Sequence, residues 1–302
     1  MRLDDFDPND IDVGEARGGG GFNLGGGGGG LLFAFLPMLF SRLGCLGTAI
    51  VLGLLLVFGG FGNLGGLLSG GAPQSQQTTT GPAEVTRLCT ANANAKSACN
   101  AFDSAQKTWA AIFAQQGRTF QKPGLRFYSG SGQSGCGAAQ SAMGPFYCPT
   151  DHDIYLDTSF FDELASRFGA KGDFAQDYVI AHEFGHHIQN LLGISDQVTR
   201  MEARSSQAEG NRYSVMLELQ ADCFAGVWAA KNRDRMDPGD VQEGMTAARA
   251  IGDDTLQQET QGRIVPDSFT HGTSAQRMEW LKRGMDTGDP QQCDTFQGAL
   301  SQ

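Results

Sequence analysis

The segment AHEFGHHIQN, residues 181–190, restricts the fold more than any other part of the chain. His182 and His186 are four residues apart, so on an α-helix they lie on one face, about 40° from each other. Glu183 lies beside them, whereas His187 lies about 140° round the helix from His182. This is the HExxH pattern, in which two histidines bind zinc and the glutamate is the general base. The pattern requires a helix with one face turned to a metal, and it leaves His187 as a surface residue or a support for the ligands.

The surrounding residues also predict a helix. The stretch DFAQDYVIAHEFGHHIQNLLG begins with Asp173 and Gln176, which are spaced as a capping box, and it ends at Gly193, a residue type that commonly stops a helix. Apolar residues recur at helical spacing, almost opposite the two histidines: Ile180, Phe184, Ile188 and Leu191. We therefore expect one face in a core and the other to present ligands. The alternative is a polar helix face with ordinary surface histidines.

A catalytic zinc needs a third protein ligand, and the best candidate lies on a second predicted helix, residues 214–231. Glu218 and Asp222 are four residues apart and therefore neighbours on one face of that helix, beside an apolar stripe. Two adjacent carboxylates repel each other unless a cation or a donor lies near them. We predict that Glu218 binds the metal and that Asp222 accepts the free N–H of a ligand imidazole, which fixes the ring orientation. The alternative is an acidic, solvated helix face.

Several motifs together resemble a known family. HEFGHHIQ, followed 32 residues after His186 by ELQAD, resembles the gluzincin pattern of zinc metallopeptidases. With GPFYCPTDHDIYLD, LELQADCFAGVWA and THGTSAQRMEWLKRG, it resembles the YpfJ-like family of neutral zinc metallopeptidases over roughly residues 84–302. The resemblance implies an α+β, zincin-like domain that is mainly helical, with a small sheet before the HExxH helix. It also implies a sheet edge to which an extended peptide can add, for which IYLD, residues 154–157, is the candidate.

The rest of this domain shows a coarse pattern of further elements. Helices are expected over residues 84–116, 159–168, 239–260 and 273–286. Strands are expected in LRFYSG and FYCPTDHDIYLD, which flank a Gly/Ser-rich loop.

The candidate ligands predict a zinc-dependent metallopeptidase. His182, His186 and Glu218 would hold one zinc per chain and leave a fourth position for water, whose pKa the metal lowers toward neutrality. Glu183 would take the proton of that water, and the resulting hydroxide would attack a carbonyl of a peptide or protein substrate. An extra donor to the oxyanion would stabilise the transition state, and His271 in FTHGTSAQR is the first candidate.

Two assignments and the function itself have alternatives. His271 is equally compatible with an ordinary surface position. Arg277 is the second candidate for the oxyanion donor and is also compatible with a structural role. The competing function is a non-catalytic, zinc-stabilised binding or scaffold module of the cell envelope. Glu183 favours the enzyme, because zinc binding alone does not require it.

The N-terminal part predicts a tail and a membrane anchor. Residues 1–30 contain six acids, two arginines and long glycine runs, a composition that predicts a disordered tail. Within a membrane region at 31–62, the apolar residues 43–61 come close to the ~20 needed to span a bilayer. Arg42 at their N-terminal edge favours a single-pass protein with a cytoplasmic N-terminus and a periplasmic or extracellular catalytic domain. Residues 63–83, rich in Gly, Ser, Gln and Thr, are expected to be a flexible linker.

Six of the seven cysteines follow this anchor, which suggests disulfides in an oxidising compartment. Many connectivities are allowed; simple proximity favours Cys89–Cys99 and Cys136–Cys148, which leaves Cys223–Cys293. A second metal site built from thiolates is the alternative, but the chain contains no CxxC pair. The chain has 33 acidic and 22 basic residues and no basic stripe, so nucleic acid is not an expected partner.

Overall fold

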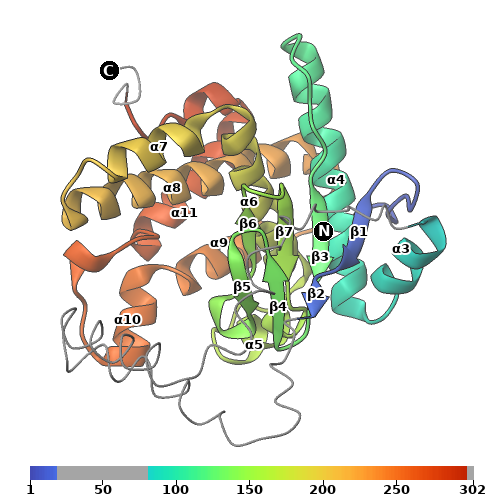
Figure 1. Ribbon diagram of the computed structural model, residues 1–302, viewed down its shortest axis with the longest axis horizontal. Coiled ribbons are helices and arrows are strands. Elements are labelled where there is room, and N and C mark those ends of the chain that lie inside the picture. The colour runs from blue at the N-terminus through green and yellow to red at the C-terminus, as the bar shows by residue number, and fades with distance from the viewer. Residues whose placement is uncertain (19–80, 298–302) are drawn as a thin grey trace, which may run out of the picture. The chain divides into compact units, whose positions relative to one another are not determined.

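Helices make up most of residues 1–18 and 81–297, the parts of the chain that this computed structural model describes (Figure 1). The α-helices are α3 (Pro82–Cys89), α4 (Ala93–Gln115), α5 (Ser159–Ser166), α6 (Asp173–Leu191), α7 (Ile194–Glu202), α8 (Gln207–Lys231), α9 (Asp240–Ala250), α10 (Asp253–Gln261) and α11 (Ser274–Thr287). Short 3-10 helices are η2 (Ser141–Met143), η3 (Arg233–Arg235), η4 (Pro266–Ser268) and η5 (Pro290–Cys293).

The expected helices are confirmed, with differences in their bounds. Residues 84–116 form two helices, α3 and α4, and α8 begins at Gln207 rather than at residue 214. The helix predicted over residues 239–260 is two helices, α9 and α10, separated by Ile251 and Gly252. At this break the chain passes directly against the start of α11, since a Cβ atom on Gly252 would lie 2.4 Å from the backbone nitrogen of Ser274. An α+β class with few strands, all of them before α6, is also confirmed.

The predicted membrane region, residues 31–62, lies outside the described residues. Within residues 1–18 and 81–297, no helix is long and apolar enough to cross a membrane. The anchor at residues 43–61 therefore stays a prediction.

The strands form two small sheets. The first has the order β1-β3-β7-β6, in which β1–β3 and β3–β7 are parallel and β6–β7 is antiparallel. Its strands are β1 (Asp12–Glu15), β3 (Gly124–Phe127), β7 (Asp153–Leu156) and β6 (Phe146–Cys148). The second sheet is antiparallel with the order β2-β4-β5, and its strands are β2 (Arg17–Gly18), β4 (Ser131–Ser134) and β5 (Gly137–Gln140).

The prediction that IYLD is a sheet edge is wrong. These residues form most of β7, which pairs with β3 on one side and with β6 on the other. All four residues of β7 are buried, because both of its backbone edges are paired and both of its faces are covered. The edge strands of this sheet are β6 and β1.

The prediction of a disordered tail over residues 1–30 is wrong for residues 1–18. They run along α4 and supply β1, and Val13 and Ile11 belong to the main hydrophobic core. The average composition of the whole glycine-rich segment hides the apolar residues at its start. The few apolar residues lie near the start of the segment, where they pack against a sheet edge and a helix.

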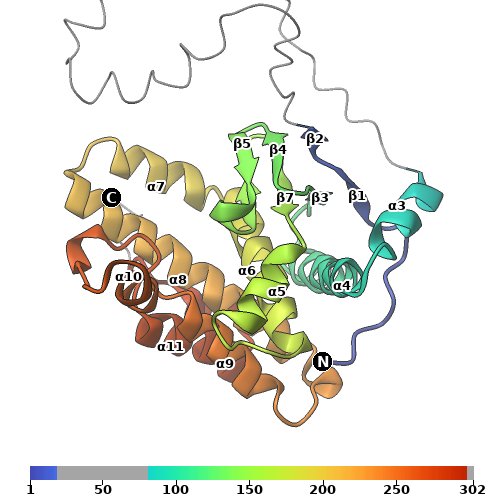
Figure 2. The same cartoon turned by 90° about the horizontal axis from the view of Figure 1, so that it is seen from below.

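Helix α6 is the central element and packs against α4, α8 and α9 (Figure 2). Helix α8 in turn packs closely along α11. The two meet at Gly226 and Gly284, where an added Cβ atom would lie 2.2 Å and 2.0 Å, respectively, from a backbone carbonyl oxygen of the other helix. Glycine at both positions therefore allows the backbones of α8 and α11 to touch.

Candidate active site

Helix α6 begins and ends where the sequence predicted, but its first turn differs. Its N-cap is Gly172, with no side-chain cap, so the predicted capping box of Asp173 and Gln176 is wrong. The side-chain amide of Gln176 instead donates to Asn94 on α4. Gly193, with φ of 74°, follows the last turn in the left-handed conformation, as expected for a helix stop. The predicted apolar stripe lies in the core.

Helix α8 approaches α6 closely at one point of the HExxH segment. A Cβ atom on Gly185 would lie 2.9 Å from the carbonyl oxygen of Ala221. Any larger residue at this position would push the two helices apart. The glycine between the two histidines thus brings α8 near enough for Glu218 to reach them.

Glu218 meets both predicted histidine ligands. Its two carboxylate oxygens lie 3.1 Å from His182 Nε2 and 3.3 Å from His186 Nε2. One potential ligand atom from each of the three residues lies within 4.8 Å of the others. Two imidazole nitrogens and one carboxylate are a ligand set that zinc takes in catalytic sites, with a fourth position left for water. The residues present therefore fit a zinc ion.

The charges at this site favour a cation. Burial lowers the pKa of His182, but the carboxylates of Asp222 and Glu218 outweigh it and raise that pKa to about 10. Burial raises the pKa of Glu218, yet the neighbouring His186 and His182 hold it well below its usual value. The two carboxylates stay ionised and attract positive charge between the imidazoles, which a divalent metal can supply.

Asp222 is hydrogen-bonded from several sides, as a support for His182. Its carboxylate accepts from His182 Nδ1 at 2.9 Å, from Arg277 Nε at 2.8 Å and from the hydroxyl of Tyr178. The pKa of Asp222 is lowered, because Arg277 and His182 outweigh the effect of burial. The sequence predicted that Asp222 accepts from a ligand imidazole, and the structure identifies that imidazole as His182. The sequence analysis missed Tyr178, although its position four residues before His182 places it on the same helix face.

Arg277 is structural, and its predicted alternative as an oxyanion donor is wrong. The side chain is 2% exposed. Its Nε and Nη2 donate to Asp222, and its Nη1 donates to the carbonyl of Ile251. The guanidinium therefore has no face left for a substrate.

His186 has a different, neutral support that the sequence analysis missed. Its Nδ1 lies 2.9 Å from Gln189 Oε1, three residues further along α6. Gln189 Nε2 donates to the carbonyl of Leu217 at 2.6 Å and to Gln220. Gln189 thus ties the orientation of His186 to the turn of α8 that carries Glu218. The i, i+3 spacing was the signal that could have found it.

The two predicted catalytic residues, Glu183 and His271, differ in their exposure and in their hydrogen bonds. Glu183 is 7% exposed, and within the described residues its carboxylate has no hydrogen-bond partner, which leaves it able to accept a proton. The side chain of His271 is 49% exposed and lies 3.3 Å from Asp253. That hydrogen bond, opposed by burial and aided by the charge of Glu218, raises the pKa of His271. His271 touches none of the three candidate ligands, so its role stays a prediction.

His187 and His152 lie in a separate buried network. His187 is fully buried rather than at the surface. Its Nε2 donates to the carbonyl of Gln121, so its Nδ1 accepts from the hydroxyl of Tyr147. Burial lowers the pKa of His187 to about 4 and keeps the ring neutral. His152 contacts the same Tyr147 hydroxyl and Asn190. Neither histidine is near enough to join the candidate zinc ligands.

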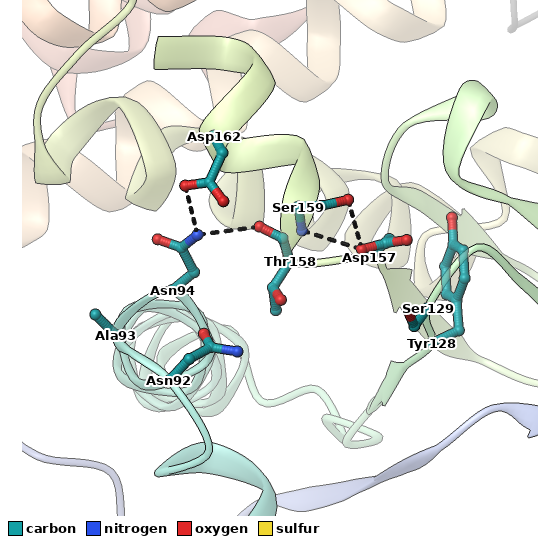
Figure 3. Close-up of a pocket in the computed structure, with 9 residues that line it drawn as sticks. All are labelled: Asn92, Ala93, Asn94, Tyr128, Ser129, Asp157, Thr158, Ser159 and Asp162. Atoms are coloured by element: carbon teal, nitrogen blue, oxygen red, sulfur yellow. Dashed lines mark hydrogen bonds between the residues drawn. The ribbon is translucent and has the colours of Figure 1, made fainter. Parts of the chain in front are cut away.

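A polar pocket of about 590 Å³ lies between the starts of α4 and α5 and the residues after β3 (Figure 3). Asn94 donates to the carbonyl of Thr158 and to Asp162, which joins α4 to α5. Asp157 accepts from the backbone and the hydroxyl of Ser159. These polar groups hold the walls together, and none of the lining residues is a predicted site residue.

All three predicted disulfides are present: Cys89–Cys99 and Cys136–Cys148, which proximity favours, and Cys223–Cys293, the remaining pair. Cys223 directly follows Asp222, and Gln220 Nε2 donates to the carbonyl of Cys293 at 2.9 Å. The third disulfide therefore joins the candidate site on α8 to the C-terminal part of the chain.

The fold and the site together define a class: an α+β protein built round a helix-borne His-Glu-His motif, with a third ligand from the next long helix, as in zinc metallopeptidases. The chain belongs to the family described as "Putative neutral zinc metallopeptidase", whose model matches residues 6–296. The resemblance drawn from the motifs is thereby confirmed.

Two curated relatives show how far the similarity extends. "Uncharacterized protein YpfJ" of Escherichia coli (strain K12) is 51% identical over 255 residues, which cover 83% of this chain and 86% of that protein. "Uncharacterized protein Rv2575" of Mycobacterium tuberculosis (strain ATCC 25618 / H37Rv) is 45% identical over 193 residues, or 60% of this chain and 64% of that protein. No solved structure matches the chain significantly.

Proposed function

We propose that the chain is a membrane-anchored, zinc-dependent endopeptidase that hydrolyses peptide bonds outside the cytoplasm. The observation that carries the proposal is the meeting of His182, His186 and Glu218 from two helices, with Glu183 next to His182 on α6. A structural zinc site closes all four positions with protein ligands, whereas this set offers three. The apolar residues 43–61 would contact the bilayer, and the three disulfides fit an oxidising compartment.

Each side chain has a part in the proposed reaction. Zinc, when bound, would act as a Lewis acid and make water acidic enough to react near neutral pH. Glu183 takes a proton from the attacking water and passes it to the leaving amine. Asp222 and Gln189 hold the two imidazoles in orientation. His271 donates a hydrogen bond to the oxygen that becomes negative in the transition state.

The test compares cleavage and zinc content on the same samples of the full chain. Glu183→Gln keeps the shape of the side chain and removes the base, so it should retain zinc and lose peptide hydrolysis by at least about 10²-fold. Glu259→Gln, the same change on the exposed face of α10, is the matched control and should leave both quantities unchanged. Cleavage is measured on a peptide library by mass spectrometry.

Two outcomes would contradict the proposal. Equal cleavage by wild type and Glu183→Gln would remove Glu183 as the base. Tight zinc binding by a wild type that cleaves no peptide would favour the non-catalytic zinc-stabilised module. His271→Ala gives a further check, because it should keep zinc and lose rate by about 10²-fold or more if His271 contacts the oxyanion.

A further inference from the structure

The N-terminal segment, defined as residues 1–18, is an integral part of the domain that carries the candidate zinc site. Its strand β1 pairs in parallel with β3 over four residues. Val13 lies opposite Leu125, and both side chains have no exposed surface. Without β1, the edge of β3 and the apolar side chains beside it would face solvent. The pairing is therefore a part of the core.

Polar contacts also hold the N-terminal segment against β3 and α4. Arg126 on β3 is 12% exposed and lies between Asp12 of the segment and Asp153 of β7, at 2.6 Å and 2.8 Å. Gln106 on α4 is buried and donates to the backbone carbonyl of Asp10 at 2.9 Å. A buried guanidinium and a buried amide thus take their partners from the N-terminal segment, which makes the docking specific.

The other end of the segment reaches the helix that carries the histidines. The side chain of Met1 is buried, and its amino group lies 2.7 Å from Asp173 and 3.3 Å from Asp240. Asp173 is the first residue of α6, and Asp240 is the first residue of α9. Figure 2 shows this end of the chain beside α9. The segment therefore extends from the edge of the sheet to the start of the helix that carries the histidines.

The chain also leaves and re-enters the domain at neighbouring points. Glu15 at the end of β1 lies 3.1 Å from Arg87 on α3, the first helix after residue 80. The match to the family model begins at residue 6, so most of the segment lies within the matched region.

We propose that the N-terminal segment and the zinc domain of one chain lie on the same side of the membrane. Residues 19–80, including the apolar residues 43–61, would then begin and end on that one side. A chain that crossed once between residues 18 and 81 would hold β1 and β3 apart by the ~30 Å of a bilayer core. The single-pass arrangement with a cytoplasmic N-terminus cannot form this sheet within one chain.

The first experiment is zero-length cross-linking of the unmodified full chain in native membranes, before any detergent is added. A carbodiimide joins an amine to a carboxylate only where they touch. Two ion pairs connect the segment to the domain, Asp5–Lys96 at 2.9 Å and Asp10–Lys122. Both cross-linked peptide pairs should be found by mass spectrometry. The Asp103–Lys107 pair within α4 reports that the reagent reached the domain.

Cross-links that formed only after solubilisation would overturn the proposal, because the segment would then dock after leaving another compartment. Docking between chains is tested by co-expressing a Lys96→Arg, Lys122→Arg variant with an Asp5→Asn, Asp10→Asn variant. In that mixture these cross-links can form only between two chains. We expect none of these cross-links between chains. If they formed in the same yield as in the wild type, pairing within one chain would be overturned.

The second experiment measures sidedness directly. Asn9 and Glu259 are exposed, one in the segment and one on α10. Each is changed to cysteine separately, with Cys45→Ser as background, and treated with a membrane-impermeant maleimide before and after permeabilisation. We expect the two positions to be labelled, or protected, together. Labelling of Glu259→Cys with protection of Asn9→Cys, or the reverse, would overturn the proposal.

Discussion

Asp177 on helix α6 and Asp222 on helix α8 are both buried, yet their pKa values are shifted in opposite directions. Asp222 accepts hydrogen bonds from Arg277, Tyr178 and His182, and its pKa is lowered although burial acts to raise it. Within the described residues Asp177 receives one hydrogen bond, from Ser97 at 3.4 Å, and burial raises its pKa well above the usual value. Similar burial thus goes with a lowered pKa for Asp222 and a raised pKa for Asp177.

The difference shows what keeps a negative charge inside this domain. A buried carboxylate stays ionised where donors and a cation surround it, and otherwise it holds its proton. The ionised one is the carboxylate that orients a candidate zinc ligand. His186, the other candidate histidine, relies on the uncharged Gln189. We therefore expect unequal losses of stability and of zinc affinity when the supports of the two histidines, Asp222 and Gln189, are removed one at a time.

The largest effect is expected for Asp222→Ala. It leaves Arg277 buried without its carboxylate, which should lower the free energy of unfolding by about 3–5 kcal/mol. Zinc affinity should fall by about 10- to 100-fold, because His182 loses its acceptor. Both are measured on the full chain, by urea denaturation of the metal-free protein and by competition with a zinc chelator.

The control for Asp222→Ala is Asp286→Ala, which removes an exposed ion pair with Lys282 and should change stability by no more than about 1 kcal/mol. Adding Arg277→Met to Asp222→Ala should recover part of the lost stability, since the unpaired charge is gone. A double variant that is no more stable than Asp222→Ala would show that the lost carboxylate, and not the stranded guanidinium, causes the loss.

Gln189→Met should have the second largest effect. It keeps the volume of the side chain, removes the acceptor of His186 and removes the side-chain donor to the carbonyl of Leu217. We expect a loss of about 1–3 kcal/mol in stability and of about 10-fold in zinc affinity. If chelator competition gave a loss as large as that of Asp222→Ala, charged and neutral supports would be equivalent here.

Tyr178→Phe should be smaller again, because it removes one of several hydrogen bonds to Asp222 and leaves Arg277 in place. A loss of about 0.5–1.5 kcal/mol is expected, with a change in zinc affinity of a few-fold. The same two titrations measure it. No loss of stability would mean that the hydroxyl contributes nothing to holding the carboxylate.

Asp177→Asn should leave zinc binding unchanged and alter stability in the opposite direction. The folded protein keeps Asp177 protonated above its usual pKa of 3.8, so the wild type loses stability as pH rises from that value through the raised folded pKa. The nearby Asp173 and Asp240 raise the pKa of Asp177 further, and the amino group of Met1 acts to lower it. Denaturation at a series of pH values should show the variant gaining stability over wild type as pH increases. A difference that did not vary with pH would show that Asp177 is ionised in the fold.

Local spacing in the sequence was enough for the helices and for the ligand face. His182 and His186 share a face because a helix turns by a fixed angle per residue, and the same rule placed Ile180, Phe184 and Ile188 in the core. Gly193 marked the end of α6, and short separations favoured two of the disulfides. These features depend on residues near one another in the chain, and such residues have few arrangements to choose from.

Contacts between distant segments were decided by the tertiary structure. Spacing placed Asp222 beside Glu218, but not the guanidinium of Arg277 that keeps it ionised. By its sequence, strand β7 resembles any short apolar strand. Only its pairing with β3 and β6 shows that it lies in the interior of the sheet.

The acidic, glycine-rich composition of residues 1–30 predicts disorder, because composition does not reveal that Arg126, Lys96 and Lys122 lie opposite acids of residues 1–18. Pattern and composition report which residues share a face. Which face another segment covers depends on burial and pairing across the whole fold, and this decided the place of the N-terminal segment.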